Sequence, residues 1–294
     1  MNIIRYKRIP STNTKAYQLA EKGAPEWTVV VSEAQTRGRG RAGKSWISPK
    51  GGLWFSILLR PDIPASSVWI LQFLAANATR RTVEKATKVR VQVKWPNDLV
   101  LDSGKLGGIL VESKSMGVKL SFAIVGIGLN VNLTSHALPE GATSLYIKTR
   151  RRHGLDRLLE SIVQAIRLSY SDVEKPEKVL AEWWQNCTHR RRMVQVEGPE
   201  GTVTGISIGL DPEGHLLVEK GDRSIEKLAE GSLLVLSELV NGFQFLYGTV
   251  ALATQQIHDD ERTAQGAGGP KETVEPRRRT REDRTAAFQR QADS

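Results

Sequence analysis

Residues 89–133 decide the fold, with the sequence VRVQVKWPNDLVLDSGKLGGILVESKSMGVKLSFAIVGIGLNVNL. Four β-rich runs follow one another in this stretch, at 89–95, 98–101, 106–113 and 119–133. The segments between these runs are too short for the helical crossover that joins parallel strands. The stretch therefore predicts a sheet in which antiparallel neighbours dominate.

The segments before and after this stretch predict helices that cover the sheet. Upstream lie a helix at 14–22 capped by Ser11 or Thr12, strands at 27–33 and 53–59, and a helix at about 66–88. Downstream, residues 155–186 predict two helices separated near Pro176. We therefore expect an α+β fold with a mixed, largely antiparallel sheet and helices on one face.

The pattern changes again towards the C-terminus. From about residue 190 to 237, short strands alternate with Gly-containing turns, which is typical of a small β-barrel. Beyond residue 256 the chain is polar and charged and is expected to be disordered. The predicted parts are a larger domain at 1–188, a small barrel at 189–237 and an extension at 238–294.

The composition excludes several classes of protein. The chain has 294 residues, 39% hydrophobic and 25% charged, as in a globular protein with a sizeable core. Its one cysteine, Cys187, excludes internal disulfides and multi-cysteine zinc sites. It has neither an apolar run long enough to span a membrane nor a secretory signal. We therefore expect a cytoplasmic protein with no membrane partner.

The formal net charge of +10 indicates an anionic partner. Residues 238–294 carry 8 basic and 9 acidic side chains, so the excess belongs to the residues before them. Nucleic acid, a phosphorylated small molecule and an acidic protein all remain open. A nucleic-acid-binding protein would use Arg150–Arg152 and Arg190–Arg192, although such triplets are more often solvated.

The loop TRGRGRAGKSW at 36–46 matches both the dinucleotide-binding pattern G-x-G-x-x-G and the Walker A pattern. Both motifs need a helix after the loop, because the phosphates bind at its N-terminus. Here residues 46–52 and another predicted strand follow, so we reject both motifs. The glycines and Arg37, Arg39 and Arg41 still suit a phosphate or carboxylate ligand. A P-loop NTPase stays a weaker alternative.

Three further segments carry candidate chemistry. The run Lys94–Asp98 and the following Lys105–Leu110 place lysines, an Asn-Asp pair and glycines at strand ends. The strand at 119–133 is interrupted by Gly126 and Gly128, which we interpret as a bulge or the approach of a ligand. Asn130 would present its amide there.

Taken in order, these motifs resemble the biotin protein ligase family over about residues 1–237. The motifs are Ser11–Asn13, Gly38–Trp46, Lys94–Asp98, Lys105–Leu110, Gly126–Asn130 and Ala142–Leu145. The resemblance implies a sheet like that of class II aminoacyl-tRNA synthetases and an SH3-like C-terminal barrel. It also implies that biotin and ATP, with Mg²⁺ bound mainly through the phosphates, give biotinyl-5'-AMP and pyrophosphate. Biotin would then pass to a lysine of a biotin carboxyl carrier protein or domain.

The resemblance assigns site residues by match to the family's motifs. The implied biotin-binding residues are Ser11, Thr12, Asn13, Gln35, Gly38, Arg39, Arg41, Lys105 and Gly108. The implied ATP-binding residues are Arg39, Arg41, Trp46, Lys94, Asn97 and Asn130. The implied catalytic residues are Lys105, Arg39, Lys94 and Asp98. Asp98 would either orient Lys94 or accept a proton from the acceptor lysine, and no residue is firmly assigned to the metal.

Some members of the family carry an N-terminal DNA-binding domain. Here the ligase pattern begins at residue 3, so we expect the form without that domain and no specific DNA binding. A lipoate-protein ligase of the same fold and a basic nucleic-acid-binding protein remain alternatives. The sequence leaves open the identity of the carrier protein and whether the enzyme forms a homodimer through a sheet edge.

Overall fold

The computed structural model describes residues 2–236. The predicted extension at 238–294, including the disorder expected beyond residue 256, lies outside the described residues. The elements of the first part are β1 (Asn2–Ile9), α1 (Thr12–Glu21), β2 (Thr28–Gln35), η1 (Arg41–Gly43), β3 (Leu53–Leu59), η2 (Ala65–Ser67), α2 (Ile70–Thr87), β4 (Gln92–Lys94), β5 (Asp98–Leu101), β6 (Gly104–Met116) and β7 (Lys119–Leu129). They are followed by η3 (Ser135–Ala137), α3 (Leu145–Thr149), α4 (Leu155–Leu168), η4 (Tyr170–Glu174), α5 (Pro176–Gln185), β8 (Met193–Gly198), β9 (Gly201–Leu210), β10 (Leu216–Glu219), β11 (Ile225–Leu228) and β12 (Ser232–Val235).

The larger sheet has seven strands in the order β1-β2-β3-β7-β6-β5-β4. Only β1 and β2 run parallel, whereas all other neighbours are antiparallel. The mixed, largely antiparallel sheet predicted from residues 89–133 is confirmed. The prediction missed β1, an edge strand whose residues alternate irregularly between exposed and half-buried and therefore show no clear apolar period.

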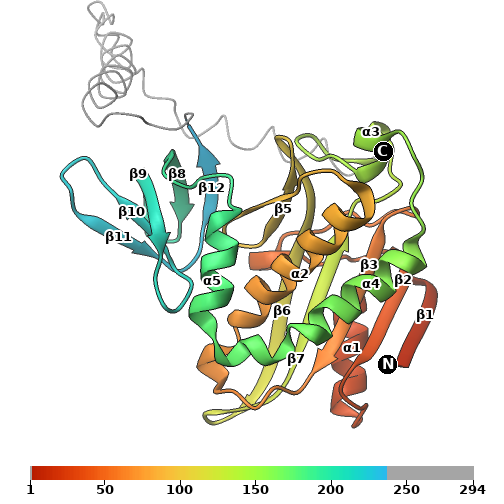
Figure 1. Cartoon of the computed structure of the whole chain (residues 1–294). Coiled ribbons are helices and arrows are strands. Elements are labelled where there is room, and N and C mark those ends of the chain that lie inside the picture. The colour runs from red at the N-terminus through yellow and green to blue at the C-terminus, as the bar shows by residue number, and fades with distance from the viewer. Residues whose placement is uncertain (1, 237–294) are drawn as a thin grey trace, which may run out of the picture. The chain divides into compact units, whose positions relative to one another are not determined.

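Helices cover both faces of this sheet (Figure 1). On β3, Phe55, Ile57 and Leu59 point into the main core, which includes apolar residues of α2, α4 and α5. Leu58 points the other way and packs with Ala16 and other residues of α1. The expected arrangement with all helices on one face is therefore wrong for α1. The continuous apolar run of β3, which is buried along its whole length, is typical of a strand covered on both faces, but it does not say which helix covers which face.

The smaller sheet has five antiparallel strands in the order β11-β10-β9-β8-β12. The expected all-β C-terminal part is confirmed. The predicted boundary after residue 188 falls in the segment between α5 and β8. The two sheets belong to one compact unit of the chain, so the division into two domains there stays a proposal.

The last long helix, α5, packs on the larger core through Trp183. The Trp183 ring contacts the Phe73 ring of α2 edge-on, with centroids 5.2 Å apart. Cys187, which follows α5, is buried and free. Among the described residues, no helix is long and apolar enough to cross a membrane.

Candidate active site

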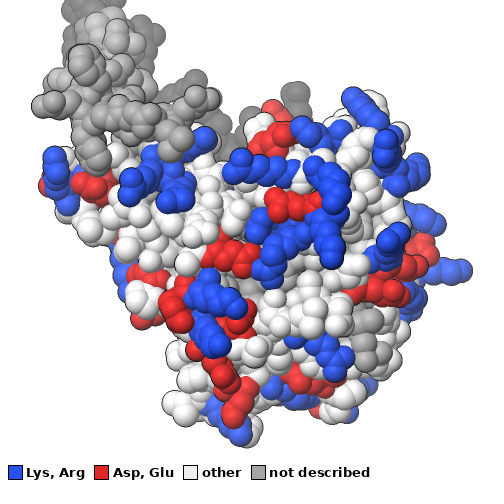
Figure 2. Space-filling view, in the orientation of Figure 1, with Lys and Arg blue, Asp and Glu red and all other residues white. Residues whose placement is uncertain are grey.

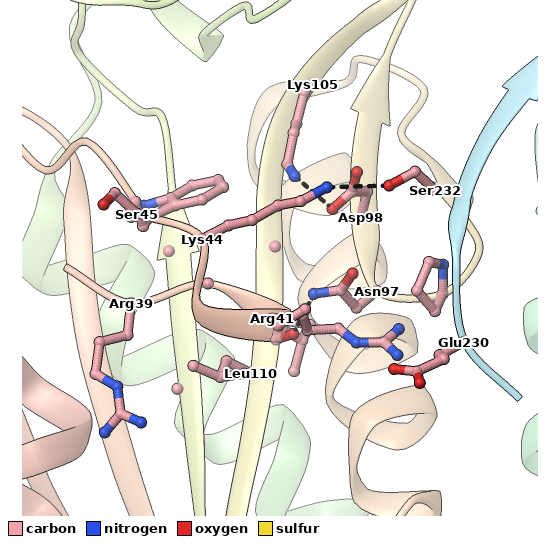
Figure 3. Close-up of a pocket in the computed structure, with 18 of the residues that line it drawn as sticks. Arg39, Arg41, Lys44, Ser45, Asn97, Asp98, Lys105, Leu110, Glu230 and Ser232 are labelled. Atoms are coloured by element: carbon pink, nitrogen blue, oxygen red, sulfur yellow. Dashed lines mark hydrogen bonds and ion pairs between the residues drawn. The ribbon is translucent and has the colours of Figure 1, made fainter. Parts of the chain in front are cut away.

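A cavity of about 520 Å³ opens where the glycine-rich loop, the β4–β5 turn and the N-terminus of α1 meet (Figure 3). Its size is within the range of small-molecule sites. It brings together all of the predicted site residues except Gly38 and Asn130. The predicted residues that line it are Ser11, Thr12, Asn13, Gln35, Arg39, Arg41, Trp46, Lys94, Asn97, Asp98, Lys105 and Gly108.

One part of the lining is a neutral cluster, which we define as Ser11, Thr12, Asn13 and Gln35 together with Ser56 behind them. Ser11 caps α1, and all three residues at this helix end are buried. Ser56 is fully buried in β3, and its Oγ lies 2.6 Å from Asn13 Oδ1 and 2.8 Å from Thr12 Oγ1. The polar groups at the helix end are therefore held by hydrogen bonds from the sheet below.

The amide of Gln35 is also fixed in orientation. Its Oε1 accepts from the backbone N–H of Thr12 at 2.7 Å and from Thr12 Oγ1 at 3.1 Å. Its Nε2 donates to Ser48 Oγ at 2.8 Å. Because Oε1 must face the Thr12 donors, the network itself sets which end of the amide faces α1.

Glu112 of β6 connects the neutral cluster to the glycine-rich loop and was missed by sequence reasoning. Its Oε2 accepts from Asn13 Nδ2 at 2.8 Å, and its Oε1 pairs with Arg39 Nη2 at 2.7 Å. The signal in the sequence was a carboxylate at the end of the apolar run Ile109–Val111. Arg39 is half-exposed at this ion pair, so it lies at the cavity with a carboxylate already beside it.

The glycine-rich loop contains one 3₁₀ turn, η1, and residues 44–52 lead to β3 without a helix. The rejection of the Walker A and dinucleotide motifs is therefore confirmed. The loop is closed by the backbone N–H of Gly40 donating to Lys44 O and that of Trp46 donating to Gly38 O. Within the loop, a Cβ on Gly38 would stand 2.3 Å from Trp46 O, so only glycine fits at this position.

The two glycines of β7 make room for neighbouring side chains. A Cβ at Gly126 would lie 2.0 Å from Asn13 Oδ1, and one at Gly128 would lie 2.6 Å from Trp46 Nε1. The register between β7 and β3 runs through both glycines without a shift. The bulge considered from the sequence is therefore wrong, and the glycines admit Asn13 and Trp46 into the site instead.

A second part of the lining is a cationic cluster, defined as Arg41, Lys94 and Lys105. Lys105 Nζ pairs with Asp98 Oδ1 at 2.7 Å and lies 5.1 Å from the centre of the Trp46 ring. The Trp46 ring, at the end of the glycine-rich loop, thus lies beside the Lys105 ammonium group. We expected Asp98 to orient Lys94, but the ion pair that Asp98 forms is with Lys105.

The other two cations of this cluster are partly buried. Burial lowers the pKa of Lys94; nearby Asp98 opposes this shift and Lys105 adds to it. Burial also lowers the pKa of Arg41, against the opposing effect of Glu230 and Asp98. Positive charge is therefore held at a cost in solvation, which an anionic ligand would offset.

The two asparagines assigned to the nucleotide lie differently. Asn97 lines the cavity, and its Nδ2 donates to Ile109 O at 2.7 Å. Asn130 is buried outside the lining, and its Nδ2 donates to the backbone carbonyl of Lys105 at 3.3 Å. Asn130 therefore supports the Lys105 backbone and does not face the cavity.

The C-terminal sheet completes the cavity with residues that the sequence did not indicate. They are Glu197, Gly198, Pro199, Glu230, Gly231, Ser232 and Leu233. Lys44 of the glycine-rich loop donates to Ser232 Oγ at 3.0 Å (Figure 3). These residues are far from the loop in sequence and form no motif, so only the fold brings them to the site.

Comparisons with known proteins agree with this site. The model of the biotin/lipoate A/B protein ligase family matches residues 6–130, and that of the biotin protein ligase C-terminal domain matches residues 192–233. The bifunctional ligase/repressor BirA of Bacillus subtilis is 33% identical over 230 residues, which is 75% of this chain and 70% of the relative. The biotin–acetyl-CoA-carboxylase ligase of Mycobacterium tuberculosis is 30% identical over 224 residues, 73% of this chain and 82% of the relative.

A solved structure has the same fold. The biotin protein ligase from Aquifex aeolicus, in complex with biotin and ATP, superposes with a TM-score of 0.68 at 28% identity. The match covers 80% of this chain and 99% of that one. Sequence motifs, cavity and comparisons lead to one conclusion: the chain belongs to the biotin protein ligase family.

Proposed function

We propose that this protein is an ATP-dependent biotin–acetyl-CoA-carboxylase ligase that works in two steps within the one cavity. In the first, an oxygen of the biotin carboxylate attacks the α-phosphorus of ATP, and the bond to the β-phosphate oxygen breaks. Biotinyl-5'-AMP forms and pyrophosphate leaves. In the second, a lysine amine of a biotin carboxyl carrier protein attacks the acyl carbon. AMP leaves with the electrons of the broken bond, and the nitrogen loses a proton.

The observation that carries this proposal is the juxtaposition of the neutral cluster and the cationic cluster in one cavity. The reaction needs a polar, uncharged ligand part to be held beside a carboxylate and a triphosphate. Cations must offset the repulsion between those two anions and the charge that develops at phosphorus. The Aquifex aeolicus relative, solved with biotin and ATP, supports the same pair of ligands here.

The neutral cluster is proposed to hold the ring system of biotin. Ser11, Thr12 and Gln35 would bond its polar edge, with Asn13 beside them and Gly108 allowing the ligand to approach β6 closely. Gly38 would act indirectly, because it shapes the loop and does not line the cavity. Since these groups are already oriented by Ser56, Ser48 and Glu112, little reordering is needed on binding.

The cationic cluster is proposed to serve the reacting groups. Lys105 would bind the biotin carboxylate and then the acyl oxygen, and Lys94 would meet the phosphates. Arg39 and Arg41 lie on the loop that would cover both ligands, with Trp46 packed beneath it. Asn97 would serve the nucleotide directly, whereas Asn130 would act through the Lys105 backbone.

Asp98 has two proposed duties. In the free enzyme its ion pair holds Lys105 toward the cavity. In the second step it would accept the proton of the acceptor lysine. If Asp98→Asn kept normal transfer from preformed biotinyl-5'-AMP while losing adenylation, the proton-acceptor duty would be wrong and the orienting duty would stand.

The carboxylates of the cavity fit the magnesium that the family's chemistry implies. Mg²⁺ prefers oxygen ligands and is commonly held by one or two carboxylates together with substrate phosphates. Asp98, Glu197 and Glu230 all line the cavity and supply such oxygens. Because Asp98 is engaged by Lys105, Glu197 and Glu230 are the better donors. The ion would neutralise phosphate charge and favour release of pyrophosphate.

The partner is proposed to be a biotin carboxyl carrier protein with an acidic surface. Basic side chains gather in the upper half of the face in Figure 2, which carries α3 and the upper ends of β5, β8 and β12 in Figure 1. ATP as a substrate and a lone buried cysteine support our expectation of a cytoplasmic enzyme. A homodimer and the lack of specific DNA binding stay predictions.

The direct test feeds the purified chain ATP with biotin or with lipoate and measures pyrophosphate. We expect biotin-dependent release and a carrier domain heavier by one biotin in mass spectrometry. Release with lipoate alone would instead indicate a lipoate-protein ligase. The match to the biotin protein ligase C-terminal domain favours biotin.

A further inference from the structure

The segment between α5 and β8 runs along the free edge of β4. The backbone N–H of Val93 donates to Asn186 O at 3.0 Å, and that of Thr188 donates to Val93 O at 2.9 Å. At the next position, the backbone N–H of Trp95 donates to the ring Nε2 of His189 at 3.2 Å. The histidine ring therefore takes the place of a backbone acceptor and continues the ladder by one residue.

The His189 ring is fully buried and makes a hydrogen bond at each ring nitrogen. It has no exposed surface, and its Nδ1 lies 2.8 Å from Ser207 Oγ on β9. Because the N–H of Trp95 donates to Nε2, the proton of the neutral ring is on Nδ1 and points to Ser207. Burial lowers the pKa of His189 to about 3, and nearby Lys94 adds to this effect. The ring therefore stays neutral and keeps Nε2 as an acceptor at neutral pH.

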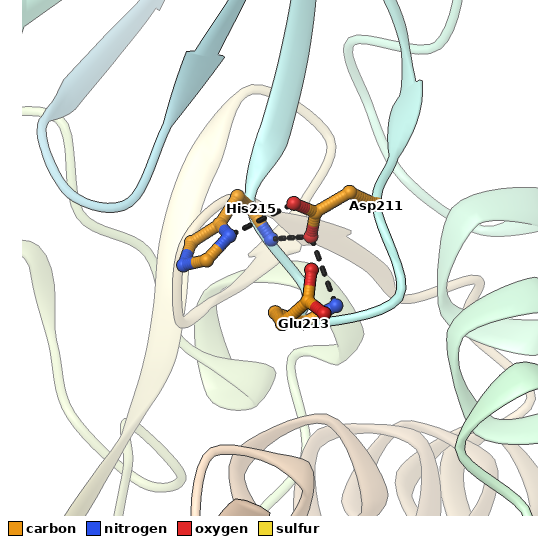
Figure 4. A group of neighbouring side chains, drawn as sticks. All are labelled: Asp211, Glu213 and His215. Atoms are coloured by element: carbon orange, nitrogen blue, oxygen red, sulfur yellow. Dashed lines mark hydrogen bonds and ion pairs between the residues drawn. The ribbon is translucent and has the colours of Figure 1, made fainter. Parts of the chain in front are cut away.

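A second hydrogen bond ties Trp95 to the C-terminal sheet. Its indole Nε1 donates to the backbone carbonyl of Gly214 at 3.3 Å. Gly214 belongs to the loop between β9 and β10, whose shape is set by Asp211 (Figure 4). Asp211 Oδ1 accepts from the backbone N–H groups of Glu213 and His215, at 2.9 and 2.8 Å.

The cluster of Asp211, Glu213 and His215 has the composition of a metal site but serves this loop instead. The second oxygen of Asp211 is taken by His215 Nδ1 at 2.9 Å and by Lys227 Nζ at 2.5 Å. A bound ammonium group at that oxygen competes with any cation. The cluster thus holds the turn that presents the Gly214 carbonyl to Trp95.

We propose that His189 and the Gly214 carbonyl are positioning groups for the adenylation reaction, through which the C-terminal sheet holds Trp95 in place. Trp95 is buried between Lys94 and the Asn97–Asp98 pair, so fixing its backbone and ring fixes the residues proposed to meet the nucleotide. This inference rests on the proposed function. In this proposal the C-terminal sheet positions the residues that meet the nucleotide and has no effect on the neutral cluster.

The test compares His189→Ala, His189→Gln and His153→Ala in steady-state pyrophosphate release. His189→Ala is expected to raise KM for ATP about tenfold, because a buried N–H loses its acceptor, and to leave KM for biotin unchanged. His189→Gln, whose Oε1 can accept the same hydrogen bond, should recover most of the loss. His153 bonds Thr149 and does not line the cavity, so its variant serves as the matched control.

An unchanged KM for ATP in folded His189→Ala, or an equal rise in KM for biotin, would overturn the proposal. If that variant does not fold, Trp95→Phe decides, because it keeps an aromatic ring and removes the donor to Gly214. A rise of about threefold in KM for ATP would support the proposal, and no rise would overturn it. If the wild type released no pyrophosphate with biotin, the proposed function would fail. Calorimetric ATP affinity of the same variants would then test the positioning role separately.

Discussion

The neutral cluster and the cationic cluster face the same cavity but are held in different ways. Around Ser56, Thr12 and Gln35, polar groups bond one another and are satisfied before any ligand arrives. Around Lys94 and Arg41, positive charges are partly buried. The neutral cluster can therefore bind a ligand without rearranging. In the cationic cluster, burial makes the positive charges unfavourable, and an anionic ligand would offset that cost.

Because the two clusters are held differently, substitutions in them should cause different losses. A change in the neutral cluster removes one hydrogen bond and leaves a partner unsatisfied, which costs about 1–3 kcal/mol. A change in the cationic cluster removes charge where charge develops during reaction, which typically costs a factor of about 100 to 1000 in rate.

The largest effect is expected for Lys105→Ala. Lys105 is the cation proposed to bind the biotin carboxylate and then the acyl oxygen, so adenylation should slow by about 100-fold or more in its absence. Pyrophosphate release measures the rate. Lys50→Ala is the matched control, because Lys50 is 83% exposed and pairs with Glu33 away from the cavity. Equal losses in the two variants would remove Lys105 from the mechanism.

Lys94→Met should weaken ATP use by about 10- to 100-fold while making the fold more stable. Since burial lowers the pKa of Lys94, its charged form is less favourable in the folded chain than in the unfolded chain. That penalty applies below the folded pKa and disappears as pH rises toward the unfolded value. Methionine removes it at neutral pH, so thermal unfolding should occur at a higher temperature than in wild type. A lower unfolding temperature would contradict this account of the cationic cluster.

Ser56→Ala tests the neutral cluster with a smaller expected effect. The loss leaves Asn13 Oδ1 without its 2.6 Å contact, so KM for biotin should rise about tenfold with kcat nearly unchanged. Ser115→Ala, on an exposed part of β6, is the matched control. If kcat fell and KM for biotin did not change, Ser56 would belong to catalysis and the division between the clusters would be wrong.

The smallest effect is expected from salt. Exposed basic side chains are proposed to steer the carrier protein, and such attraction is screened at high ionic strength. Raising the salt from about 0.05 to about 0.5 M should slow transfer to the carrier about threefold and adenylate synthesis less. The two half-reactions are measured separately, with preformed biotinyl-5'-AMP for transfer. Equal slowing of both would mean that salt acts on the cationic cluster within the cavity.

Much of the fold was predictable because its signals are local. Ser11 does cap α1, β3 begins and ends at the predicted residues, and short hairpins do join β5, β6 and β7. The position of α1 on the opposite face was not predictable, because the apolar run of β3 indicates that both faces are covered but not which helix lies on which face. The edge strand β1 lacked an apolar period and was missed.

In the candidate site, too, residues in local motifs were predictable and residues joined by long-range contacts were not. Residues in motifs, such as Lys94, Lys105 and Gln35, line the cavity as predicted. Ser56 and Glu112 were missed because their contacts with Asn13 join residues 43 and 99 positions apart. Asn130 was expected at the ligand, but it lies outside the cavity lining. A motif gives the residue type and not the direction of its side chain.

The most direct test of the two-cluster account is calorimetric titration of biotin and of ATP, each alone, into wild type, Ser56→Ala and Lys94→Met. We predict that Ser56→Ala weakens biotin binding about tenfold and leaves ATP binding unchanged, whereas Lys94→Met does the reverse. If both variants weakened both ligands alike, the cavity would act as a single unit and the division of labour between its clusters would be contradicted.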